Sequence, residues 1–141
     1  MSKKEAHIDA LLHAAHCHGP RAAYHAYFHY FNTQKFYDAP AALESLCLQE
    51  RDGPNNTFFK PLTHLAGASA HLKKNRLKPA AALLRLSRSY LETYPALHQD
   101  LNLINVLALI DYWLNLLQQG RANPLGKHAA PHLDLSRKSI L

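Results

Sequence analysis

Four side chains in the middle of the chain have the types and the spacing for acid–base chemistry. His64 and His71 are seven residues apart, so a helix over this stretch places them on one side. Asp38 or Glu44 on a neighbouring helix would pair with His64, and a histidine oriented by a carboxylate titrates where general acid–base catalysis operates. The same pair would also serve as a buried hydrogen bond that fixes two helices.

Histidine is abundant, and two histidines have the spacing of metal ligands. His25 and His29 are four residues apart, so both rings face one way on a helix. His13 and His16 offer a second pair nearby. The alternative is a polar face of surface histidines, because few carboxylates stand among them. We therefore expect no cofactor, with His25 and His29 as the candidates if a metal is bound.

The second half of the chain is basic. The formal net charge is +6, and residues 71–141 hold ten basic and four acidic side chains. Such a concentration attracts phosphates or an acidic partner, although a solvated helical surface has the same composition. No aromatic residue is interleaved with the basic ones, which argues against nucleic acid. The candidate binding residues are Lys73, Lys74, Arg76, Lys78, Arg85 and Arg88.

The familiar signatures of catalysis are missing from the sequence. It has no glycine-rich phosphate loop, no nucleophile elbow and no paired-cysteine zinc motif. Its two cysteines, Cys17 and Cys47, form no framework, which is typical of a reduced cytoplasmic setting. The longest apolar region, 101–117, is interrupted by three asparagines and an aspartate, so no membrane association is expected.

Apolar residues recur at helical spacing through most of the chain. No strand-like alternation stands out. Short loops favour antiparallel neighbours, so the prediction is an all-α fold, a compact bundle of five to six helices built from antiparallel helical hairpins. The expected helices cover residues 5–17, 21–32, 35–50, 58–74, 77–94 and 100–119.

Helix borders follow from local signals. Pro61 fits the first turn of a helix, Asn75 suits a left-handed cap, and Asp100 suits an N-cap. Gly120 ends the last helix. We therefore expect one helical domain over residues 1–120 and a C-terminal tail over 121–141. Only residues 133–141 of this tail suit a short helix, and the tail either lies on the domain or waits for a partner.

Two blocks of residues resemble a known family. Residues 30–44 read YFNTQKFYDAPAALE, and residues 59–66 read FKPLTHLA, followed by HLKKN at 71–75. Over residues 24–118 the chain resembles domain-of-unknown-function family 309, small all-helical bacterial and archaeal proteins. The matching positions are Phe31, Asn32, Phe36, Asp38, Ala39, Leu43, Glu44 and His71.

The departures from this family fall on its polar positions. The family has histidine and glutamate where this chain has Pro40 and Ala41, and two glutamines where it has Lys60 and His64. Its glycine is replaced by Pro61. The resemblance implies a helical bundle with no agreed activity, in which this chain has lost most of the family's polar cluster.

Three functions remain in contention. The leading hypothesis is a non-enzymatic protein-interaction or self-association module, acting on a protein partner or as a homodimer. The first alternative is a metal-assisted or acid–base, hydrolase-like enzyme that uses Asp38, Glu44, His64 and His71. The second alternative is nucleic-acid binding through the basic region 73–88.

Overall fold

A computed structural model describes residues 20–49, 56–120, 123–126 and 129–135 of the chain. The expected helix over residues 5–17, with His13, His16 and Cys17, lies outside this part. The described elements are α2 (Pro20–Asn32), α3 (Asp38–Gln49), α4 (Asn56–Lys73), α5 (Leu77–Leu91), β1 (Leu97–His98), β2 (Leu101–Asn102), α6 (Leu103–Gln119) and the 3₁₀ turn η1 (Pro124–Gly126).

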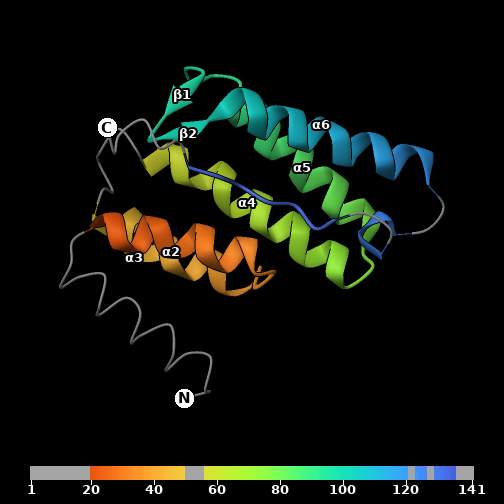
Figure 1. Cartoon of the computed structure of the whole chain (residues 1–141), viewed down its shortest axis with the longest axis horizontal. Helices are drawn as coiled ribbons and strands as arrows, with labels where there is room; N and C mark the ends of the chain where they lie inside the picture. Colours follow the sequence, from red (N-terminus) through yellow and green to blue (C-terminus); the bar gives the residue numbers. More distant parts are fainter. Residues whose placement is uncertain (1–19, 50–55, 121–122, 127–128, 136–141) are drawn as a thin grey trace, which may run out of the picture.

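The helices pack in the order of the chain. α2 packs on α3, α3 on α4, α4 on α5, and α5 on α6, so each helix contacts its successor. In Figure 1 the α2–α3 hairpin lies against α4, and α6 covers α5 on the far side. The predicted all-α class, built from packed helix pairs, is confirmed.

Aromatic residues of α2 form one end of the core. They recur every three or four positions, which places one face of the helix against α4. Tyr27 is fully buried, and its hydroxyl donates a hydrogen bond to the carbonyl oxygen of Leu62 on α4. Burial and the neighbouring Tyr24 raise the pKa of Tyr27, so its hydroxyl stays protonated and keeps this link between the helices.

The α4–α5 hairpin depends on small residues. A Cβ atom at Gly67 would lie 3.3 Å from Cδ1 of Leu83, so glycine allows the two helices to approach closely. The buried hydroxyl of Ser87 donates a 2.8 Å hydrogen bond to the carbonyl oxygen of Pro61. Pro61 lies in the second turn, because α4 begins at Asn56. The predicted start at residue 58 was therefore late.

A β-hairpin joins α5 to α6, and the expectation of a chain without strands was wrong here. Leu97 pairs with Asn102 and His98 with Leu101, around a turn in which Gln99 and Asp100 both have positive φ. Two such residues form the tight turn that matches the twist of paired strands. The hydroxyl of Tyr24 donates a 2.8 Å hydrogen bond to the Gln99 carbonyl oxygen, which ties the turn to α2.

Several further helix borders differ from expectation: α3 begins at Asp38 rather than at residue 35, and α6 begins at Leu103 rather than at residue 100. The side chain of Asn102, not Asp100, caps α6 by accepting a hydrogen bond from the Asn105 amide. α5 ends at Leu91 rather than at residue 94. Asn75 has the predicted left-handed conformation, with φ of 59°, and Gly120 is the C-cap of α6.

The described part of the tail lies on the bundle. Residues 129–134 have no regular secondary structure, and Leu135 forms an antiparallel bridge with Leu101 of β2. The helix expected from residue 133 is therefore wrong for residues 133–135. Figure 1 shows this stretch running back across the helices, from the end of α6 toward β2. None of the helices in the described residues is both long and apolar enough to cross a membrane.

Candidate functional site

The chain's own residues 129–135, called here the C-terminal segment, pack against the bundle. Asn32, the last residue of α2, recognises the segment's backbone with both ends of its side-chain amide. Its Nδ2 donates to the carbonyl oxygen of Leu133 at 2.7 Å, and its Oδ1 accepts from the Leu133 amide at 2.8 Å. One side chain thus satisfies both backbone polar groups of one residue.

The side chains of the segment alternate between the bundle and solvent. Pro131 and Leu133 are buried, with Leu133 only 3% exposed and part of the hydrophobic core. His132 and Asp134 are exposed and pair with each other at 2.8 Å. This alternation is that of an extended chain lying on a surface, in which every second side chain points inward.

Two further contacts hold the ends of this region. The Nδ2 atom of Asn123 donates a hydrogen bond to the carbonyl oxygen of Leu72 at the end of α4, before the segment begins. Leu135 bridges to Leu101 at the other end. The segment is therefore attached to α2 and β2, and the residues before it to α4.

An open cleft of about 450 Å³ continues from the end of the segment. Leu97 and Ile104 are among the most exposed large apolar side chains in the described residues, and both line it. Amide side chains stand beside them. The cleft is lined by Ala96, Leu97, Asn102, Ile104, Asn105, Asp134 and Leu135.

The four acid–base candidates do not form the predicted pair. In the described part of the chain, His64 makes no hydrogen bond with Asp38 or Glu44. Its ring lies 5.9 Å from that of Tyr90, and its Nδ1 is buried without a partner. Burial and, secondarily, the charge of Lys60 lower the pKa of His64.

The remaining three candidates lie elsewhere. Asp38 begins α3 and is half-buried near Tyr30, whose pKa is raised by burial and then by this carboxylate. Glu44 is exposed on α3, and His71 is half-buried near the end of α4. Among the residues that the structure describes, His64 therefore forms no couple with Asp38 or Glu44.

The metal candidates are placed as surface residues. His25 and His29 are both exposed on α2, with the ring of His25 beside that of Tyr24 and the ring of His29 beside that of Tyr30. Across the ranges that the structure describes, no three histidine, cysteine or acidic side chains gather as metal ligands. Two exposed histidines alone supply only half of a tetrahedral set.

The predicted basic binding residues fall into two groups, one paired with carboxylates and one not. Arg88 donates to Asp111 at 2.7 Å and to Glu92 at 2.8 Å, and its hydrogen bond and attraction to Asp111 raise its pKa. Lys73 donates to the backbone oxygen of Gln34. No carboxylate of the described ranges pairs with Lys73, Lys74, Arg76, Lys78 or Arg85, which are all exposed.

The comparisons with known proteins return nothing: no family model matches the chain, and no curated protein or solved structure is significantly similar to it. Membership of domain-of-unknown-function family 309 stays a prediction.

The role of Asn32 was not predicted from the sequence, in which this residue stood out only as a helix end and as a position that matches the family pattern. An asparagine at the end of a helix is a common stop signal, and its partner lies 101 residues further along the chain. The alternation of Pro131, Leu133 and Leu135 was a signal that pointed to an extended segment.

Proposed function

We propose that this protein is a non-catalytic interaction module that binds an extended, leucine-containing segment of a partner protein. The binding site is the place now held by the C-terminal segment. The observation that carries the proposal is the two-point contact of Asn32 with the backbone of Leu133. Backbone contacts supply affinity for any extended peptide, and the pockets for alternate side chains supply selectivity.

The selectivity follows from what the bundle buries. The positions of Pro131 and Leu133 face the core, so a partner needs an apolar residue at each. The positions of His132 and Asp134 face solvent and tolerate polar residues. The recognised pattern is thus proline, any residue, leucine, any residue, leucine, with the last leucine entering the cleft beside Leu97 and Ile104.

The C-terminal segment is suited to exchange. It carries no regular secondary structure, and it is joined to α6 through Gly120 and the residues that follow. A short extended segment that is held at a few points, such as Leu133 and Leu135, opens at a lower free energy than the helices of the core. Release of the segment by one copy and its capture by a second copy gives the homodimer that the sequence suggests, as a domain swap.

The test uses the full chain with Leu133→Asp, which disfavours burial of its own segment. A labelled peptide AAPHLDL, the sequence of residues 129–135, is added in trans and followed by fluorescence anisotropy. One buried leucine and two net hydrogen bonds support a dissociation constant on the order of 100 μM to 1 mM. The unsubstituted chain binds more weakly, because its site is occupied.

Two controls make the result specific. A peptide methylated on the Leu133 nitrogen cannot donate to Asn32, so it binds about tenfold more weakly. Asp134→Ala in the chain leaves the segment seated and binds peptide like the unsubstituted protein. The proposal fails if the Leu133→Asp chain, folded by circular dichroism, gains no affinity for the peptide or binds the methylated form equally well.

A further inference from the structure

We infer that the face formed by α4 and α5 binds single-stranded nucleic acid, independently of the peptide site. The charge of this hairpin is the first observation. Residues 58–90 contain seven basic side chains and no acidic one. Arg88 is neutralised by Asp111 and Glu92, while no carboxylate of the described ranges pairs with the other six. Unpaired cations at this density attract a polyanion.

Two of the six cations, Lys60 and Lys74, share one stripe along the α4 helix and its last turn. Lys60, His64, Gly67, His71 and Lys74 alternate at spacings of four and three residues, so they lie in one stripe. Lys60 and Lys74 are exposed at its two ends, with the half-buried residues between them. Lys74 directly follows the end of α4, and fourteen residues at the rise of a helix place it about 21 Å from Lys60. The stripe is thus long enough to follow a stretch of backbone phosphates.

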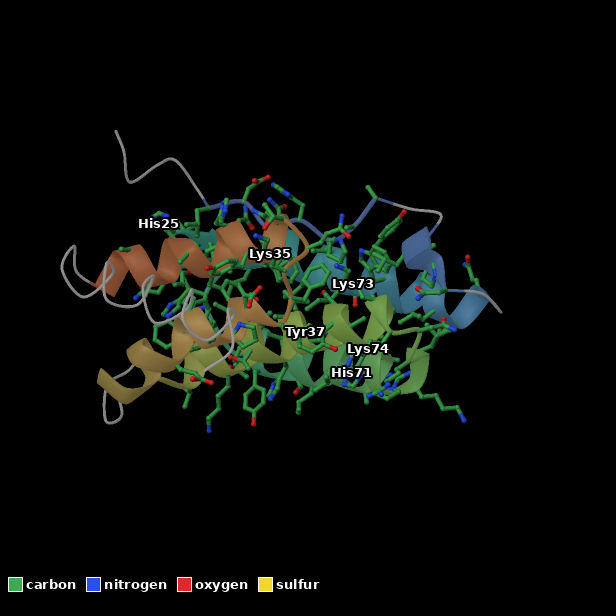
Figure 2. All side chains as sticks on the ribbon, turned by 90° about the horizontal axis from the view of Figure 1, so that it is seen from below. His25, Lys35, Tyr37, His71, Lys73 and Lys74 are labelled. Carbon is green, nitrogen blue, oxygen red and sulfur yellow. The ribbon has the colours of Figure 1, made fainter. Side chains whose placement is uncertain are left out.

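Exposed aromatic rings flank this stripe, although they are far apart in sequence. Tyr37, before α3, is 48% exposed, and Lys74 Nζ lies 5.0 Å from its ring centroid. Tyr90, on α5, is 38% exposed and lies beside His64. Figure 2 shows Tyr37, His71 and Lys74 gathered on the same side of the molecule. The fold therefore supplies the aromatic partners that the basic region lacks in sequence.

This combination fits nucleic acid better than an acidic protein. Tyr90 lies beside His64 and Tyr37 beside Lys74, and these two positions are about 15 Å apart at the rise of a helix. Two non-adjacent bases of one strand can stack on such rings without sequence preference, while lysines contact the phosphates between them. A single strand suits the site because its bases are free to reach the rings.

The experiment measures binding of a fluorescein-labelled twelve-nucleotide oligo(dT) to the full chain by anisotropy. Four phosphate contacts give a slope of about −2.8 for log affinity against log salt, or about a 50-fold loss between 50 and 200 mM salt. Tyr37→Ala and Tyr90→Ala each weaken binding by about 5- to 150-fold, the effect of losing one stacked base. Lys74→Gln lowers the slope, and Lys74→Arg preserves it.

The matched control is Tyr112→Ala. Tyr112 is 49% exposed on α6, so it has the same exposure and lies off the α4–α5 face. If the inference holds, Tyr112→Ala leaves the affinity for oligo(dT) unchanged. Leu133→Asp also leaves this affinity unchanged, because it acts on the peptide site. The inference is overturned by an absence of binding at 50 mM salt, by equal affinity of all three tyrosine variants, or by tighter binding of a glutamate-rich peptide than of oligo(dT).

Discussion

Replacing Asn32 by alanine isolates the contact on which the peptide site depends. The change removes the 2.7 Å bond to the Leu133 carbonyl oxygen and the 2.8 Å bond from the Leu133 amide. A neutral hydrogen bond contributes a net stabilisation of about 0.5–1.5 kcal/mol, so the loss is about 1–3 kcal/mol. That loss raises the open population of the segment by about 5- to 150-fold, since 1.4 kcal/mol is a factor of ten.

Amide hydrogen exchange at Leu133, followed by NMR, reads this equilibrium directly, because that amide donates to Asn32. In Asn32→Ala the exchange rate of the Leu133 amide rises about 5- to 150-fold, in proportion to the open population, while amides in the middle of α4 keep their exchange rates. Asp134→Ala is the control, since that side chain is exposed and pairs with His132 of the same segment. Equal exchange rates at Leu133 in the unsubstituted chain and in Asn32→Ala would refute the role of the contact.

Three other predictions concern the bundle. Ser87→Ala removes the buried hydrogen bond to Pro61 and lowers the free energy of unfolding, measured by urea denaturation, by about 1 kcal/mol. Ser89 is exposed, so Ser89→Ala changes this free energy little. Equal losses in the two variants would contradict the role of the buried bond. Arg88→Gln breaks exposed ion pairs and lowers the free energy of unfolding only slightly, because solvent screens these charges. The difference from the unsubstituted chain shrinks in 1 M salt, and a large, salt-independent loss would argue against this interpretation. The pKa of His64 is lowered in the folded state, so its contribution to stability is complete above the unfolded pKa of about 6.5 and is lost as the pH falls below that value. His64→Gln therefore flattens the fall in melting temperature between pH 7 and 5, and an unchanged pH profile would count against the assigned burial.

The helices were predictable because their apolar faces are strongly periodic. The aromatic residues of α2 recur every three or four positions, and that spacing alone places the helix against a core. The start of α4 was misjudged because proline usually occupies a first turn, whereas Pro61 lies one turn further in. The carbonyl oxygen of Pro61 accepts a hydrogen bond from Ser87, which lies 26 residues further along the chain.

The hairpin between α5 and α6 had almost no local signal. Its strands have two residues each, too short for alternation, and its turn uses Gln99 and Asp100 where asparagine and glycine are usual. The hydrogen bond from Tyr24 helps to hold this turn, and it joins residues 75 positions apart. Such a contact follows from the packing of α2, which the sequence does not specify residue by residue.

Contacts between distant parts of the chain decided which candidate sites could be predicted from the sequence. Helical spacing correctly places His64 and His71 on one side of α4, but it does not say which neighbour that side faces. His64 meets Tyr90 of α5 rather than a carboxylate of α3. Asn32 and Leu133 pair across 101 residues, so no local pattern connects them. Only the arrangement of the helices in space brings out the peptide site and the flanking tyrosines.

The most direct measurement is an NMR titration of the ¹⁵N-labelled Leu133→Asp chain with unlabelled AAPHLDL peptide, observing the side-chain amide of Asn32. The account predicts that the two Asn32 Nδ2–H signals shift in a saturable manner, and that the peptide methylated at its leucine nitrogen shifts them far less. Asn32 signals that stay in place while other residues respond, or that respond to neither peptide, would contradict the claim that this side chain recognises an extended partner.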